Sequence, residues 1–135
     1  MLRTLWLIAA VASATLACDD NPVGPSDVIA HEWQLVSIER EGSSPIAVPD
    51  PSRYTLRLEE GGRVAVRSDC NSCGGTYSMS GLSLEIASLA CTRAFCGEAS
   101  LDSTYVQALE GRKAVSADAS ELTISGNGRV LRFRR

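Results

Sequence analysis

The chain has 135 residues, of which 44% are hydrophobic, and a formal net charge of −3. Without residues 1–17, which contain one arginine and no acid, 12 basic and 16 acidic residues remain. Because nucleic-acid-binding modules normally carry a basic surface, this acidic balance argues against a nucleic-acid partner. The 106 residues from position 30 onward suffice for one domain with one hydrophobic core.

The first segment, residues 1–17, has the layout of a secretory signal: one charge at Arg3, an apolar core and a small-residue end. Its apolar stretch is shorter than the ~20 residues that cross a bilayer as a helix. Cys18 follows the small residue Ala17, as a bacterial lipoprotein cleavage site requires, although Thr15 stands where leucine is usual. We expect Cys18 to become the diacylated N-terminus. The alternative is an ordinary signal peptide cut near Ala17.

Residues 18–29 are polar, contain proline and glycine and show no periodicity. Such a segment cannot bury enough apolar surface to fold, so we expect a flexible tether. The predicted organisation is therefore a signal peptide (1–17), a tether (18–29) and a folded domain (30–135). Lipid at Cys18 would anchor that domain to the inner or outer membrane of a bacterial envelope, on the periplasmic or surface side.

Most of the domain shows the alternation of apolar and polar residues that is typical of half-buried strands. Glycine-containing turns near Gly61 and Gly126 indicate two hairpins, and the pair Gly74-Gly75 also indicates a turn. A proline-containing loop is expected over residues 41–52. The predicted strands cover residues 33–38, 54–59, 63–67, 82–86, 121–124 and 130–133.

Residues 100–110 have helical spacing instead, with Ser100 as a possible cap and Gly111 as the stop. The predicted fold class is α+β: a single antiparallel sheet of about seven or eight strands packed on one helix. Much of the core should come from Trp33, Leu35, Leu56, Leu58, Val64, Val66, Tyr77, Leu84, Ile86, Leu101, Tyr105, Leu109, Leu122, Ile124 and Phe133.

Four cysteines, Cys70, Cys73, Cys91 and Cys96, form two close-spaced pairs within the domain. Behind an export signal they indicate two disulfides, because oxidation persists outside the cytoplasm. The spacing also resembles a four-cysteine zinc ribbon, and Cys70-x-x-Cys73 could be a redox dithiol. Four cysteines permit three pairings, and spacing alone leaves them open.

Cys70-Asn71 stands before a glycine-rich turn, residues 82–86 alternate, and Thr92-Arg93-x-x-Cys96 stands before a helix. These three stretches resemble the META domain, the family of the heat-shock-inducible bacterial lipoprotein HslJ. Many members have methionine where this chain has Ala94 and Phe95. The resemblance implies the pairings Cys70–Cys96 and Cys73–Cys91, because members with one cysteine pair keep the outer positions. It implies a compact envelope or stress-related domain and no catalytic residues.

Other candidate residues are few. His31 is the only histidine and the only possible base for a hydrolase. The cluster Arg129, Arg132, Arg134 and Arg135 could form an anion-binding patch, but alternating charges are more typical of the exposed face of a last strand. We therefore expect a non-enzymatic, monomeric envelope lipoprotein without a cofactor. It would bind an envelope protein or a small ligand, or support the envelope under stress. A thiol-disulfide redox protein or a metal-binding protein with four cysteine ligands is the alternative.

Overall fold

The computed structural model describes residues 24–135, and Cys18 with the predicted signal peptide lies outside them. This part contains one α-helix, α1 (Asp102–Leu109), and two short 3-10 helices, η1 (Pro25–Asp27) and η2 (Pro51–Arg53). Ten strands accompany them, all paired in antiparallel fashion. They are β1 (Glu32–Arg40), β2 (Ile46–Ala47), β3 (Tyr54–Glu59), β4 (Arg63–Ser68), β5 (Asn71–Ser80), β6 (Ser83–Ile86), β7 (Ala90–Cys91), β8 (Gly111–Ala117), β9 (Glu121–Gly126) and β10 (Arg129–Arg134).

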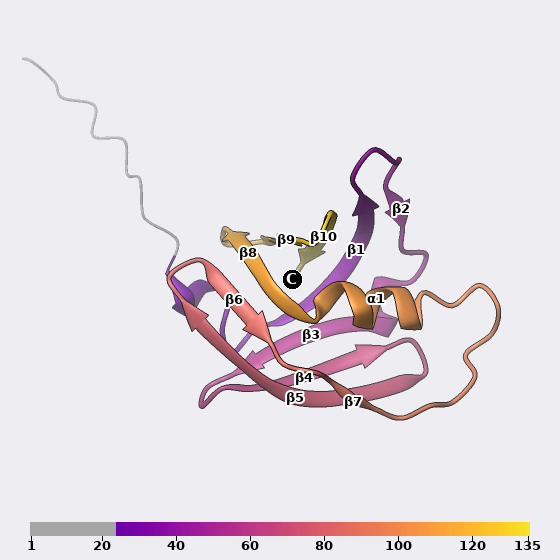
Figure 1. Cartoon of the computed structure of the whole chain (residues 1–135), viewed down its shortest axis with the longest axis horizontal. Coiled ribbons are helices and arrows are strands. Elements are labelled where there is room, and N and C mark those ends of the chain that lie inside the picture. Colours follow the sequence, from indigo (N-terminus) through magenta and orange to yellow (C-terminus); the bar gives the residue numbers. More distant parts are fainter. Residues whose placement is uncertain (1–23) are drawn as a thin grey trace, which may run out of the picture.

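Eight of these strands form a closed barrel in the order β10-β9-β8-β6-β5-β4-β3-β1, because β1 also pairs with β10. The short strands β2 and β7 pair with β1 and β5 at residues beyond those that pair with β3 and β6. The predicted sheet of seven or eight strands on a helix was therefore incomplete: there are ten strands, and the sheet closes on itself (Figure 1). Closure pairs the first and last long strands, so neither strand is left as an open edge.

Several boundaries differ from the expectation. Gly74 and Gly75 lie inside β5 rather than in a turn. A Cβ added at Gly75 would stand 3.2 Å from Leu89 Cδ2, so the glycine lets residues 88–89 pass close to the strand. The predicted loop at residues 41–52 contains β2 and η2. Strand β8, which directly follows α1, was not predicted.

The core lies inside the barrel, where alternate side chains of each strand meet. Thirteen of the fifteen predicted core residues are buried; Tyr77 and Leu101 are only partly buried and pack against the others. The Tyr77 hydroxyl donates a 2.8 Å hydrogen bond to the Glu59 carbonyl, which accounts for its place at the surface. The buried set also includes residues that the prediction omitted, such as Val28, Ile38, Val115 and Leu131.

Helix α1 turns its apolar side toward the barrel interior rather than lying on the outer face of an open sheet. Tyr105, Ala108 and Leu109 are buried. The Tyr105 ring stands 5.9 Å from that of Tyr54 on β3 and 6.2 Å from that of Phe133 on β10, measured between centroids. Figure 1 shows α1 within the curve of the sheet. Within residues 24–135, no helix is long and apolar enough to cross a membrane.

Candidate functional site

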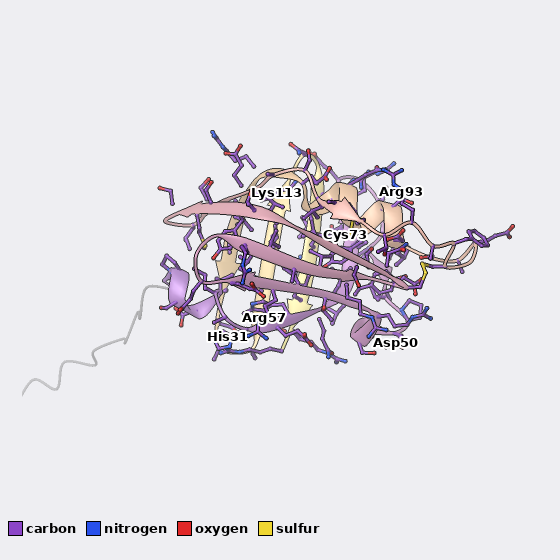
Figure 2. The ribbon with its side chains drawn as sticks, turned by 90° about the horizontal axis from the view of Figure 1, so that it is seen from below. His31, Asp50, Arg57, Cys73, Arg93 and Lys113 are labelled. Atoms are coloured by element: carbon purple, nitrogen blue, oxygen red, sulfur yellow. A yellow bond between two sulfur atoms is a disulfide. The ribbon has the colours of Figure 1, made fainter. Side chains whose placement is uncertain are left out.

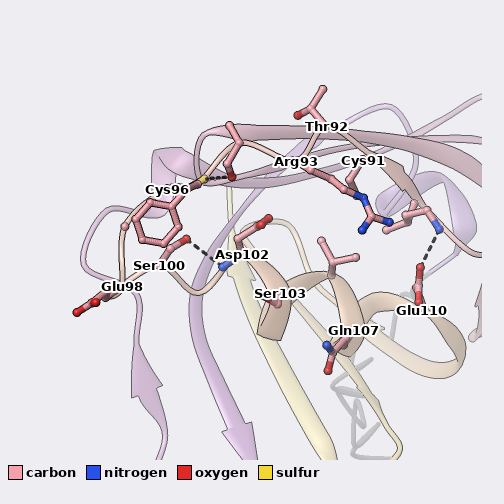
Figure 3. A pocket seen from close by; sticks show the side chains of 15 residues that line it. Cys91, Thr92, Arg93, Cys96, Glu98, Ser100, Asp102, Ser103, Gln107 and Glu110 are labelled. Atoms are coloured by element: carbon pink, nitrogen blue, oxygen red, sulfur yellow. Dashed lines mark hydrogen bonds between the residues drawn. The ribbon is translucent and has the colours of Figure 1, made fainter.

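A groove with a volume of about 730 Å³ lies between α1 and the segment that precedes it (Figure 3). That segment, residues 92–101, contains no helix or strand and is called here the disulfide loop. Its side of the groove includes Arg93, Phe95 and Glu98, while α1 contributes Val106 and Gln107.

Two disulfides fasten this loop to β5 and to the residue just before it. Cys73 bonds Cys91 at the start of the loop, where the two residues are also paired in the β5–β7 ladder. Cys70 bonds Cys96 farther along the loop. This is the nested pairing that the family resemblance implies. All four sulfur atoms are used, so binding of zinc by these cysteines would require both bonds to be reduced.

The amide of Asn71 holds the loop between the two disulfides. Its Oδ1 accepts hydrogen bonds from Ala94 N at 2.8 Å and Thr92 Oγ1 at 3.0 Å. Its Nδ2 donates to the Ala94 carbonyl and to Asp102 Oδ2, both at 3.0 Å. Asn71 is 1% exposed, so these bonds are shielded from water. The loop has more residues between its two cysteines than the facing segment has, so it must bend. The hydrogen bonds of Asn71 to Thr92 and Ala94 hold that bend in place.

A second polar cluster fixes the end of the loop. The Tyr54 hydroxyl donates to Asp69 Oδ2 at 3.1 Å and accepts from Leu101 N at 3.0 Å. Asp69 also forms an ion pair with Arg53. The loop is therefore held at its start, its middle and its end before α1 begins. A surface loop with this many fixed points loses little conformational entropy when it binds something.

The groove combines apolar and charged groups. Phe95 is 83% exposed, an unusual state for a large aromatic side chain. Glu110 is engaged, because its Oε1 accepts a 2.8 Å hydrogen bond from Leu89 N. Arg93 extends over the groove (Figure 3). Among residues 24–135, neither Arg93 nor Glu98 belongs to an ion pair. This composition suits contact with a polypeptide: one aromatic anchor with a charged rim.

His31 does not belong to this site. It lies toward the other end of the molecule from Arg93 (Figure 2) and borders a separate hollow with Ile29 and Tyr77. Its ring meets the edge of Trp33 at a centroid distance of 6.3 Å. The structure therefore places the only histidine of the sequence apart from the cysteines and from the groove.

The four C-terminal arginines do not form one patch. Arg132 pairs with Glu39 at 3.8 Å, and the Arg135 guanidinium lies 5.4 Å above the Trp33 ring. Arg134 is exposed. Arg129 is half-buried and donates to the Thr104 carbonyl of α1 at 3.2 Å. Side chains alternate between the two faces of β10. Arg129 is on the inward face with Leu131 and Phe133, whereas Arg132 and Arg134 are on the outward face.

Sequence reasoning missed the roles of Asn71 and Phe95. Asn71 stands two residues before Cys73, so both point inward from β5, and a polar residue at an inward position needs partners. The spacing of two residues between Asn71 and Cys73 could therefore have predicted that Asn71 is buried and hydrogen-bonded. The exposure of Phe95 had no such signal, because an aromatic residue between cysteines is equally consistent with burial.

Comparisons with known proteins agree with this fold. The family model described as META domain matches residues 26–135. A protein from Burkholderia xenovorans, solved by NMR, has 23% identity and a TM-score of 0.68, over 99% of this chain and 98% of its own. A lipocalin-like protein from Bacteroides uniformis has 19% identity and a TM-score of 0.57, over 81% of this chain and 98% of its own.

A search of curated proteins found no match. The structural likenesses are below 25% identity and therefore support the barrel fold alone. The family match covers nearly all of the described residues. Together with the disulfide-fastened loop and the antiparallel barrel, it shows that this chain belongs to the META domain family.

Proposed function

We propose that this protein is a lipid-anchored bacterial envelope protein that binds a partner protein without catalysing a reaction. The Phe95 ring is the anchor for that partner. The observation that carries this proposal is an aromatic side chain, 83% exposed, on a loop fixed by two disulfides and by Asn71. Aromatic anchors in preorganised settings supply much of the affinity of protein interfaces.

The partner has an apolar pocket for Phe95 and a polar rim around it. Beside Phe95, the groove offers apolar contact at Leu89 and Val106 and opposite charges at Arg93 and Glu98. Burial of the ring in the complex supplies the main driving force, about 25 cal/mol for each Å² of apolar surface removed from water. The charged rim favours partners with a matching arrangement of charges.

Binding depends on Phe95 and not on exposed apolar surface in general. Leu82, which is 47% exposed in the β5–β6 turn, provides the matched control. Proximity crosslinking in the native envelope should capture a defined partner with wild type and Leu82→Ala and lose it with Phe95→Ala. Capture that is equal for all three proteins would refute the proposal. Reduction of both disulfides should weaken capture as Phe95→Ala does.

The membrane anchor rests on the sequence of residues 1–18. Diacylation of Cys18 would hold the domain at the membrane, since two acyl chains bind stably where one does not. Mass spectrometry of the mature protein should find a lipid-modified N-terminus at Cys18, and Cys18→Ser should release a soluble form. An unmodified terminus that begins elsewhere would contradict the anchor while leaving the Phe95 test intact.

A role under envelope stress is proposed from the family resemblance. A strain without the protein should tolerate heat or envelope damage less well than the parent strain. Wild type should restore tolerance, and Phe95→Ala should not. Restoration by both proteins would separate the stress role from binding through Phe95.

A further inference from the structure

Lys113 is the only lysine in the sequence, whose other 12 basic residues are arginines. It lies on β8, on the inward side shared with Val115 and Ala117, and is 3% exposed. Within the described part of the chain, its Nζ has no hydrogen-bond partner. A buried ammonium group without a partner destabilises a fold. Its presence therefore calls for a reason other than stability.

The Lys113 side chain lies against Gly126 of β9. Ala114 pairs with Ser125, and Gly126 pairs with Arg129, so Lys113, Gly126 and Arg129 occupy neighbouring positions on three adjacent strands. A Cβ at Gly126 would stand 2.9 Å from Lys113 Cδ, closer than real Cβ contacts. Arg112 O would be equally close, at 2.9 Å, so the missing side chain at Gly126 makes room both for the backbone of β8 and for the lysine side chain.

Arg129 brings a second positive charge to the same place. Its guanidinium donates one bond to the Thr104 carbonyl, at 3.2 Å. Among residues 24–135, neither Arg129 nor Lys113 forms an ion pair with a carboxylate. Burial, and then the charge of Arg129, lower the pKa of Lys113, which agrees with two close cations that lack a counter-charge.

Arg129 borders a hollow of about 300 Å³ between α1 and the β1–β2 turn. Arg40, its partner in the β1–β10 ladder, lines the same hollow, as do Ser43 and Ser44. Two acids are nearby: Glu39 and Glu41 line an adjoining hollow that also contains Arg129, and Glu39 already pairs with Arg132. Ile38, Ile46 and Thr104 complete the lining of the hollow, and neither a carboxylate nor Lys113 is among its residues.

We propose that Arg129 and Arg40 bind, in this hollow, a small molecule that carries a phosphate or carboxylate group, with the buried Lys113 beside Arg129 as the unbalanced charge behind the site. The anion would supply the missing counter-charge, with Ser43 and Ser44 as further hydrogen-bond donors. Bonds between ionised donors and an oxyanion are the strong class of hydrogen bond, more so where water is excluded. The site goes beyond the function proposed for Phe95 and does not depend on it.

Because the chain has one lysine, lysine labelled with ¹³C gives side-chain NMR signals from Lys113 alone. The full-length protein is titrated with inorganic phosphate and separately with acetate, with chloride keeping the ionic strength constant. The lysine signals should shift saturably with at least one anion, and the stronger response identifies the headgroup. Arg129→Gln should weaken that anion by about tenfold or more, the effect of losing one charged hydrogen bond.

Arg57→Gln is the matched control, because Arg57 is exposed on β3 and its loss changes the net charge equally. It should bind the anion as wild type does, as should Phe95→Ala. Lysine signals that do not respond to either anion beyond the chloride effect would overturn the proposal. An equal loss in Arg57→Gln and Arg129→Gln would also overturn it, because it would mean general charge attraction.

Lys113→Met separates binding from structure. Without anion it should melt at a higher temperature than wild type, because it removes an unpartnered buried charge. Phosphate or acetate should raise the melting temperature of wild type by mass action and leave that of Lys113→Met unchanged. A variant that melts lower and still responds to the anion would refute the inference. If this variant fails to fold, the Arg129→Gln titration decides.

Discussion

Replacing Asn71 with aspartate tests whether this residue holds the disulfide loop. The change keeps the shape and both acceptor bonds, from Ala94 N and Thr92 Oγ1. An ionised aspartate would lose both donor bonds of Nδ2, to the Ala94 carbonyl and to Asp102 Oδ2, whereas a protonated one could keep one of them. The introduced oxygen, when ionised, faces the Ala94 carbonyl oxygen and the Asp102 carboxylate and cannot donate a hydrogen bond to either.

The magnitude follows from these contacts. Loss of a neutral hydrogen bond costs about 1 kcal/mol, and loss of one to a charged group about 1.5–3 kcal/mol. Two ionised carboxylates at the 3.0 Å separation now seen between Asn71 Nδ2 and Asp102 Oδ2 would repel strongly, so the introduced group should stay protonated. Holding an ordinary Asp protonated at pH 7 costs about 4 kcal/mol. The protonated hydroxyl keeps one of the two donor bonds, so loss of the other adds about 1 kcal/mol to this cost, and we expect Asn71→Asp to be destabilised by about 5 kcal/mol at neutral pH.

The sign of the pH dependence is specific. The folded state raises the pKa of the introduced carboxyl above its unfolded value, so the folded state holds more protons between the two values. The stability of Asn71→Asp relative to wild type should therefore fall as pH rises from about 4 toward 7. Urea unfolding of the oxidised proteins, monitored by circular dichroism, measures the free energy of unfolding of both proteins at about pH 4 and at pH 7.

Asn71→Ala is the control: it removes all the amide bonds but adds no carboxyl, so it should be destabilised with the pH profile of wild type. A difference between Asn71→Asp and wild type that stays constant with pH would refute the reasoning. A loss below about 1 kcal/mol would mean that the disulfides alone hold the loop, since that is the value of a single neutral bond.

Further changes probe other parts of the barrel. Tyr105→Phe should stabilise the protein by about 1 kcal/mol in urea unfolding, because the buried hydroxyl has no partner within residues 24–135; a destabilised variant would show that it has one. Leu84→Ala should lose about 2–5 kcal/mol, since Leu84 is fully buried, and a loss under 1 kcal/mol would contradict its place in the core. Joint replacement of Cys73 and Cys91 by alanine should cost about 3 kcal/mol in the chain-entropy model, and unchanged unfolding would refute a structural role for this bond. Phe95→Ala should leave stability within about 0.5 kcal/mol of wild type, whereas a large loss would place the ring in the core.

Local pattern predicted the strands that alternate cleanly. Residues 54–59 alternate, and β3 has those bounds. The helix at residues 100–110 was predicted in its place, and Gly111 follows it with φ of +87°, a conformation that favours glycine. The strands that were missed lack such alternation or contain glycine, as at Gly74 and Gly75 in β5. There, pairing with β4 outweighs the low strand propensity of glycine.

The sequence by itself determined the family, most of the core and the local elements, because each depends on short-range periodicity or on a contiguous motif. Only the tertiary structure decided that the sheet closes into a barrel, that Phe95 is exposed, and that Arg129 lies on the strand next to the one that Lys113 faces. These features arise from contacts between residues far apart in the chain, such as the pairing of β1 with β10. The sequence states the chemistry of each side chain. Its partners depend on which distant strands the fold brings next to it.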